Sequence, residues 1–228
     1  MKFIKASWIF FICFSMSSLA HSQDKQDDKQ EEKIAAATNV LSDFGKMKEN
    51  IPAELLKVTN GIIIVPKLIK AGFVLAGKRG KGVAMVKLSD GSWSDPVFVT
   101  ITGGSIGLQA GVQSEDLVLI FKKASTLQDM GKGSFTLGGD ISVTAGPVGR
   151  SSSAATDYKM EAEVYSYSRS KGLFAGISLS GSSIAVDEKA NENFYGEPET
   201  SATIFSTSSN TSPSVNELKT TLKSLYQE

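Results

Sequence analysis

The chain has 228 residues, of which 24 are Lys or Arg and 24 are Asp or Glu. A length of this order is enough for one domain with a real core, and a balanced charge argues against a nucleic-acid binder that works by overall charge. Twenty-one glycines against six prolines lack the period of collagen and are unusual for a helical bundle, so the composition favours a β-rich fold.

The first 20 residues are typical of a secretory signal peptide. Lys2 and Lys5 precede an apolar run over residues 8–16, and Ser18 and Ala20 provide the small residues of a cleavage site. The large residues that flank Cys13 argue against a lipoprotein anchor. We therefore expect an exported protein, periplasmic or secreted and possibly peripheral on a membrane.

Cleavage after Ala20 would leave a mature chain of net charge −2 without cysteine, and His21, the one histidine, would be its first residue. A chain without cysteine has no disulfide, thiol nucleophile or thiolate metal site. A terminal histidine argues against a Ser-His-Asp triad and against histidine-ligated zinc. We therefore expect neither thiol nor triad catalysis, and no cofactor and no metal.

Two helices are predicted before the first strand. Residues 21–33 form a polar, highly charged arm, and the apolar residues after it recur every three or four positions, as on one face of a helix. Pro52 and the pair Asn60-Gly61 bracket a second short helix over 53–59. The first helix lacks a basic polar face, which favours core packing over a membrane interface. Its apolar face consists of Ile34, Ala37, Val40, Leu41, Phe44 and Met47.

The middle of the chain has the pattern of short strands. Apolar runs occur at 62–65, 83–88, 97–102 and 117–121, and Asp90-Gly91 gives a tight-turn signal. Residues 96–114 carry no charge, but their glycines and polar residues favour strands over a membrane helix. The fold class predicted is α+β, with an antiparallel, glycine-rich curved sheet or partly closed β-barrel packed with the N-terminal helices.

The predicted organisation has five segments, two of which are the signal peptide and the polar arm. The main domain spans 34–196, and 197–214 is rich in Ser and Thr, which is typical of a flexible linker. Residues 215–228 form a C-terminal amphipathic helix with Val215, Leu218, Leu222 and Leu225 on one face.

A basic bias marks the segment between Glu54 and Asp90, which contains seven Lys or Arg and no acidic residue. Interleaved with Ile69, Phe73 and Leu75, these charges would suit an anionic membrane surface. A solvated hairpin with ordinary lysines is the alternative interpretation. The candidate lipid-binding residues are Lys67, Lys70, Lys78, Arg79 and Lys81.

Two further patterns, one of a phosphate-binding loop and one of a catalytic carboxylate pair, are less specific than the basic bias. Residues 72–79 fit a phosphate-binding loop except that Arg79 replaces the hydroxyl residue, and Gly80 and Gly82 disfavour the helix that should follow. A β-hairpin is therefore preferred there. The carboxylates that could form a glycosidase pair have no distinguishing spacing, so solvent-facing charge is the preferred interpretation. They are Asp140, Asp157, Glu161 and Glu163.

Several motifs resemble the SYLF lipid-binding domain family. They are DGSWSDP at 90–96 followed by GGSIGLQAG at 103–111, AGPVGR at 145–150, YSYSRSKGLFAG at 165–176 and NFYG at 193–196. The resemblance implies one α+β domain without known catalysis. Eukaryotic members bind phosphoinositides, partly through an N-terminal amphipathic helix, and yeast relatives bind actin. By position, the two predicted N-terminal helices would correspond to that lipid-binding end.

The residues and the resemblance together predict a non-enzymatic lipid-binding domain exported to the cell envelope. Its expected ligand is an anionic phospholipid or a phosphoinositide-type headgroup, with phosphatidylglycerol and cardiolipin as the natural anionic lipids of a bacterial-type envelope. The alternative is a structural or protein-interaction module of the envelope with no lipid ligand, whose partner docks on the C-terminal helix. No nucleic acid is expected as a partner.

Overall fold

In the computed structural model, residues 28–47, 51–146, 162–170, 173–174 and 179–225 are described, with backbone alone at 73–75, 105–110, 132 and 174. The predicted signal peptide, most of the predicted polar arm, Asp157 and Glu161 lie outside these ranges. The first described element is a helix over residues 28–45.

The helices and strands follow one another along the chain from this N-terminal helix. They are α2 (Ala53–Lys57), β1 (Gly61–Val86), β2 (Val97–Phe121), α3 (Ala124–Gln128), a 3-10 helix η1 (Asp129–Lys132), β3 (Phe135–Leu137), β4 (Val143–Ala145), β5 (Val164–Ser170), β6 (Leu173–Phe174), β7 (Ser182–Val186), α5 (Glu188–Tyr195), α6 (Ser201–Phe205) and α7 (Pro213–Leu225).

The strands form one sheet in the order β3-β7-β2-β5-β4, with β1 paired to β2 and β6 to β5. β1 and β2 pair antiparallel from Gly61 opposite Phe121 to Ala84 opposite Val97. On its other edge, β2 pairs with β7 through residues 99–103 and with β5 through residues 116–121. β2 therefore connects the two ends of the sheet.

The two halves of β1 lie beside each other because the β1–β2 ribbon doubles back. The Lys87 N–H donates to the Asn60 carbonyl at 2.9 Å, which joins the two ends of β1. A Cβ on Gly82 would collide with the Ile64 carbonyl oxygen, and one on Gly80 would lie 2.5 Å from Val65 Cγ1. The four predicted strands are thus halves of two long, bent strands, and the predicted α+β fold with a curved antiparallel sheet is confirmed.

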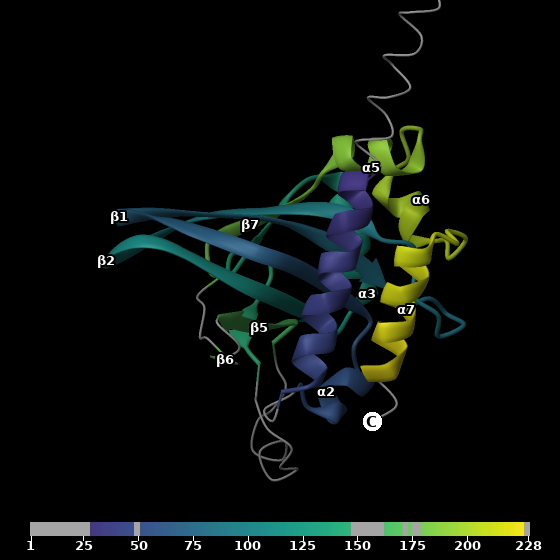
Figure 1. Cartoon of the computed structure of the whole chain (residues 1–228), viewed down its shortest axis with the longest axis horizontal. Coiled ribbons are helices and arrows are strands. Elements are labelled where there is room, and N and C mark those ends of the chain that lie inside the picture. The colour runs from purple at the N-terminus through teal and green to yellow at the C-terminus, as the bar shows by residue number, and fades with distance from the viewer. Residues whose placement is uncertain (1–27, 48–50, 147–161, 171–172, 175–178, 226–228) are drawn as a thin grey trace, which may run out of the picture.

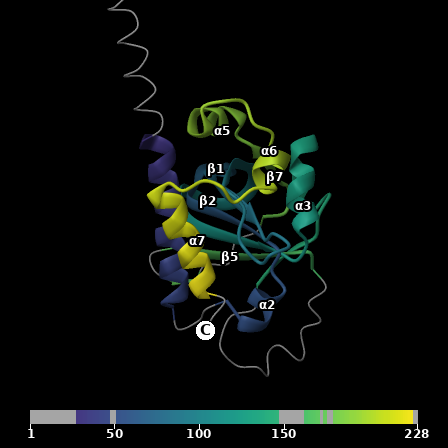
Figure 2. The ribbon, with the colours of Figure 1, turned by 90° about the vertical axis from the view of Figure 1, so that its right-hand side faces the viewer.

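Alternating side chains of these strands supply two separate apolar cores. Ile62, Ile64, Val83 and Met85 face the helix over residues 28–45 and α7, whereas their sequence neighbours face the other side of the sheet. The second core is completed by α3, α6 and residues of β3 and β7. Figure 2 shows this arrangement edge-on, with the N-terminal helix and α7 on one side and α3 on the other. Each such side chain contributes about 1.5–3 kcal/mol on burial.

The N-terminal helix packs into the first core, as its periodicity predicted. Ile34, Ala37, Leu41 and Phe44 are fully buried, and the helix lies beside α7 over one face of the sheet (Figure 1). Arg169 of β5 ties the helix to the sheet, because its guanidinium pairs with Asp43 at 2.8 Å and with Asp116 at 2.7 Å. Burial would lower the pKa of Arg169, but the hydrogen bonds and charges of these two carboxylates raise it.

The DGSWSDP motif anchors the C-terminal segment through Asp95, whose side chain is buried. One Asp95 oxygen accepts the backbone N–H groups of Ser209 at 2.9 Å and Asn210 at 3.0 Å, and the other pairs with Lys219 of α7 at 2.6 Å. Within the predicted linker 197–214, residues 201–205 form α6 and the chain after it is held by Asp95. The predicted C-terminal helix, α7, buries Val215, Leu218 and Leu222 in the first core.

Among the described residues, no helix combines the length and the apolar character that crossing a membrane would need.

We expect Gly82→Ala to destabilise the fold by about 1–3 kcal/mol, because the new methyl group would meet backbone of Ile64 that cannot move aside cheaply. Gly77→Ala is the matched control in the same strand, since no heavy atom lies within 4 Å of its Cβ position. Urea denaturation would measure both variants. Equal effects of the two substitutions would contradict the proposed close contact between the halves of β1.

We expect Asp95→Asn to lower the free energy of unfolding by about 2–4 kcal/mol. The substitution removes the buried negative charge that interacts with Lys219 and with two backbone N–H donors. Hydrogen exchange should also quicken over residues 206–222 ahead of the sheet. Asp90→Asn in the same turn is the control, because Asp90 is exposed. Unchanged exchange in the C-terminal segment would show that Asp95 does not hold it.

Candidate functional site

In the structure, two of the five predicted lipid-binding residues are exposed, and the side chains of the other three are buried or form ion pairs. Lys67 and Arg79 are exposed, and Lys67 has a positive φ of 56° at the irregularity in β1 between Val65 and Leu68. The remaining three, Lys70, Lys78 and Lys81, are paired or buried. Their assignment to lipid stays a prediction.

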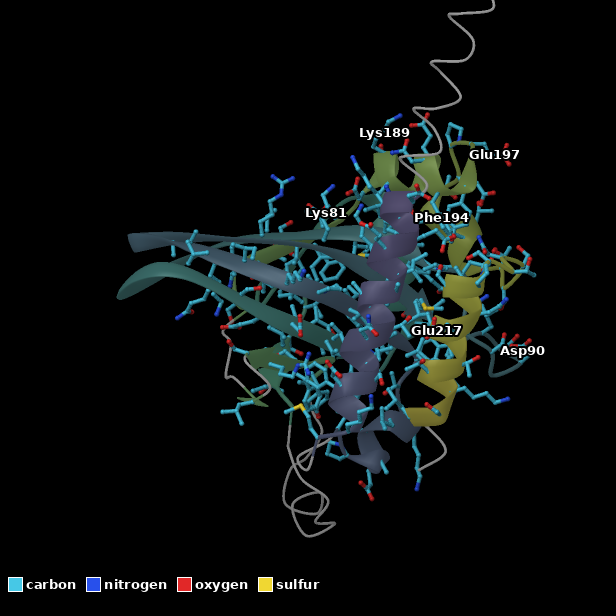
Figure 3. The ribbon with its side chains drawn as sticks, viewed as in Figure 1. Lys81, Asp90, Lys189, Phe194, Glu197 and Glu217 are labelled. Carbon is cyan, nitrogen blue, oxygen red and sulfur yellow. The ribbon has the colours of Figure 1, made fainter. Side chains whose placement is uncertain are left out.

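Lys81 belongs to a polar network at the start of α5. Its ammonium pairs with Asp187 at 2.7 Å, and Asp187 also caps α5 by accepting the Ala190 N–H. Burial would raise the pKa of Asp187, but the hydrogen bond and charge of Lys81 outweigh this effect and lower it. Figure 3 shows Lys81 near the base of the ribbon formed by β1 and β2.

Lys70 and Lys78 point to the second core and meet an acidic residue of β2 there. Lys70 Nζ lies 3.2 Å from Glu115 Oε1, and the Glu115 side chain is only 7% exposed. Lys78 is buried, so desolvation lowers its pKa, and the charge of Lys70 lowers it further while Glu115 raises it. Glu115 of β2 and Asp187, which directly follows β7, thus offset part of the positive charge of residues 54–90.

A polar cluster, which we call the interior polar cluster, consists of Lys70, Lys78, Glu115 and Ser182. Lys78, Gly103 and Ser182 are opposite one another on three adjacent strands. A Cβ on Gly103 would lie 2.7 Å from Lys78 Cε and 3.0 Å from Ser182 Oγ, so the glycine makes room for both. Among the described residues, Glu115 Oε2 and Ser182 Oγ are buried without a hydrogen-bond partner.

The exposed residues of the ribbon form a mixed apolar and basic surface, the ribbon face, made of Lys67, Ile69, Arg79 and Val112. Ile69 is 39% exposed and Val112 is 74% exposed. The pairing of Ile69 with Ser114 and of Ala71 with Val112 places both apolar side chains on one face of the two strands. β1 and β2 project beyond the helices here (Figure 1).

An open cleft of about 630 Å³, the acidic cleft, lies between α5, η1 and the start of α6. Glu188, Glu192 and Glu199 line it, and Lys189 pairs with Glu192 at 3.1 Å. Ser201 also lines this cleft, and its buried Oγ has no hydrogen-bond partner in the described part of the chain. In Figure 3, Lys189 and Glu197 mark this end of the molecule.

The weaker sequence candidates have structural roles. Residues 72–79 run within the continuous strand β1, so the β interpretation is confirmed, but the predicted hairpin turn is wrong. Asp140 accepts the Thr136 N–H at 2.7 Å in a turn, and Glu163 pairs with Lys123 at 3.2 Å on the surface. Within the described ranges, no group of three or more His, Cys, Asp or Glu is placed to hold a metal ion.

Sequence reasoning missed the residues that partner the basic segment. Glu115, Asp187 and Ser182 are between 37 and 106 positions from the lysines that they approach, so local charge counting does not find them. One signal was available: Glu115 is the first charged residue after the uncharged stretch 96–114, and it comes just before the apolar run 117–121. The NFYG motif likewise serves packing, since Phe194 stacks edge-on against Phe98 at 5.3 Å.

Comparison with known proteins agrees with the motifs. A family model described as Ysc84, Las17-binding protein actin regulator, matches residues 102–225. LAS seventeen-binding protein 3 of Saccharomyces cerevisiae is 36% identical over 203 residues, which cover 88% of this chain and 44% of that protein. SH3 domain-containing YSC84-like protein 1 of Bos taurus is 33% identical over 181 residues, which cover 79% of this chain and 53% of that protein.

A third relative, Protein YSC84 of Saccharomyces cerevisiae, is 41% identical over 159 residues, which are 68% of this chain and 34% of that protein. The chain thus spans between about a third and a half of these relatives. The matched family model covers more than half of the chain, including most of β2 and all of β5, β7 and the helices α5–α7. The chain therefore belongs to the Ysc84 family, whose domain is the SYLF domain.

Proposed function

We propose that this chain is a non-enzymatic domain that binds anionic lipid surfaces through the ribbon face. The observation that carries the proposal is the exposure of Ile69 and Val112 beside the exposed cations Lys67 and Arg79. Aliphatic side chains can enter the interface of a bilayer, while basic residues near an anionic surface each contribute about 1 kcal/mol. Export to the cell envelope is part of this proposal.

The projection of β1 and β2 supports the proposal, because it allows one face of the ribbon to approach a flat surface. The N-terminal helix is a poorer candidate in this fold, since its apolar face is occupied by the first core. Lys70, Lys78 and Lys81 have their own acidic neighbours, so we expect them to contribute less than Lys67 and Arg79.

We expect the double variant Lys67→Glu/Arg79→Glu to lower binding to phosphatidylglycerol/cardiolipin vesicles about tenfold or more, because attraction becomes repulsion at two positions. Co-sedimentation of residues 21–228 at low and high salt would measure this. The control is Lys46→Glu/Lys57→Glu, which makes the same charge change at two exposed residues, one directly after the N-terminal helix and one at the end of α2.

Ile69→Ser/Val112→Ser separates the apolar contribution from the charge. This variant should weaken the binding that remains at high salt and leave the salt-dependent part in place. Absence of vesicle binding by the unchanged protein, or an equal loss in the Lys46/Lys57 control, would contradict the role of the ribbon face.

A protein-interaction module is the second candidate function, and two observations favour it. The yeast relative is named for binding to LAS seventeen, and the family description names Las17 and actin. On this chain, the acidic cleft provides a surface that would accept a basic peptide segment through Glu188, Glu192 and Glu199.

We expect a fluorescent octa-arginine peptide to bind the acidic cleft and Glu188→Gln/Glu192→Gln/Glu199→Gln to lower its affinity about tenfold, because three attractive charges are removed. Fluorescence anisotropy would measure this. Glu54→Gln/Asp90→Asn/Glu217→Gln provides the control, since these residues are exposed and do not line the cleft. Truncation after Gly196 is unsuitable as a test, because it removes the buried face of α7. Equal binding by both triple variants would contradict this candidate.

A further inference from the structure

The acidic cleft opens where the pairing of β3 and β7 ends. Phe135 opposite Ile184 is the last pair at this end of the two strands. The next residues beyond this pair, Ser134 and Ala185, both line the cleft. Gly133 has a φ of 144°, a conformation that favours glycine, and no heavy atom lies within 4 Å of its Cβ position. The wall of the cleft is therefore low and open at Gly133.

A second cleft of about 320 Å³, which we call the neighbouring cleft, adjoins the acidic cleft. The two clefts share the lining residues Met130, Gly133 and Ser134, which belong to the segment from η1 to the start of β3. Asp129 and Asp140 line the neighbouring cleft, and both are exposed. Because the two clefts meet along this segment, they form one groove that passes over Gly133 and Ser134. We call it the peptide groove.

The charged residues that line the peptide groove, within the described part of the chain, are all acidic. Glu192 pairs with Lys189, which does not line either cleft, and Asp140 accepts the Thr136 N–H at 2.7 Å. A ligand with positive charge at both ends complements such a groove, whereas an anionic ligand would be repelled at both ends. The acids are Asp129 and Asp140 in the neighbouring cleft and Glu188, Glu192 and Glu199 in the acidic cleft.

The hydroxyl of Ser201 is an independent observation that points to a ligand. Ser201 lines the acidic cleft and is only 4% exposed, and its Oγ has no hydrogen-bond partner among the described residues. A Cβ on Gly131 would lie 2.8 Å from this Oγ, so the hydroxyl is directed at the part of the wall that η1 provides. A buried hydroxyl without a partner is costly. An N–H donor of a group bound beside Gly131 would satisfy it.

We propose that the peptide groove binds an extended polypeptide segment with basic residues toward both of its ends. One basic end pairs with Glu188 and Glu199, and the other pairs with the two aspartates of the neighbouring cleft. The main chain between them passes over Gly133 and Ser134, because small side chains permit a close approach of another backbone. The proposal rests on the second candidate function, since the acidic cleft is one half of the groove, and it adds the other half and the separation of the basic residues.

Fluorescence anisotropy with the full chain and two labelled peptides tests the groove. The two-ended peptide has a pair of arginines at each end of a short glycine segment, and the one-ended peptide has serines in place of the last two arginines. The two-ended peptide should bind about tenfold or more tightly, because its second pair of arginines binds within a complex that has already formed.

Two variants test the second half of the groove. Asp129→Asn/Asp140→Asn should lower the affinity of the two-ended peptide to that of the one-ended peptide, because it removes both charges of the neighbouring cleft. Ser134→Tyr should have the same effect without a change in charge, because the ring would obstruct the passage between the clefts. Ser125→Tyr is the matched control, since Ser125 is exposed and lines neither cleft.

Ser201→Ala removes one hydroxyl and should weaken the binding of both peptides several-fold, because both place a basic end in the acidic cleft. Unchanged binding of both peptides by this variant would contradict the assigned role of the hydroxyl.

Equal binding of the two peptides by the unchanged protein would overturn the peptide groove. Equal effects of Ser134→Tyr and Ser125→Tyr would do so as well, and spermine that competes as well as the two-ended peptide would assign the groove to small polycations. If the one-ended peptide binds and responds only to Glu188→Gln/Glu192→Gln/Glu199→Gln, the acidic cleft keeps its proposed function and the extension is wrong. Absence of binding by octa-arginine and by both peptides would contradict the second candidate function itself.

Discussion

The close approach of the two halves of β1 determines the rest of this structure. Gly80 and Gly82 leave space for Val65 and for the Ile64 backbone, and the Lys87–Asn60 hydrogen bond joins the ends of the strand. Because β2 pairs with β1 along almost its whole length, with two register shifts, it doubles back as well. Four strands at the centre of the sheet therefore come from two continuous segments, and the outer strands β5 and β7 are added to opposite ends of β2.

This doubling also distributes the charge of the molecule. Side chains alternate between the two faces of each strand, so neighbouring cations of β1 reach different surroundings. Lys78 faces the interior near Glu115, Arg79 faces solvent, and Lys81 reaches Asp187 beside α5. The ribbon face and the interior polar cluster are consequently on opposite faces of the same strands.

The motifs that identify the family mostly stabilise this arrangement. Asp95 of DGSWSDP holds the C-terminal segment, and Arg169 of YSYSRSKGLFAG links the N-terminal helix to the sheet. The NFYG segment packs Phe194 on Phe98, and the Tyr195 hydroxyl donates to the Pro96 carbonyl at 2.8 Å. Family membership therefore predicts the fold more directly than it predicts a ligand, since these residues are occupied by contacts within the chain.

The sequence by itself determined the fold class, the helix at residues 34–44 and the apolar runs that become the strand cores, because hydrophobic periodicity is a local property. It also determined the family, through motifs of fixed order. Tertiary structure alone decided that Lys70, Lys78 and Lys81 have acidic neighbours, that Ser182 lies beside Lys78, and that residues 207–210 are held by Asp95. These outcomes depend on strand register and on contacts across 37 to 124 positions, which no local count of charge or composition contains.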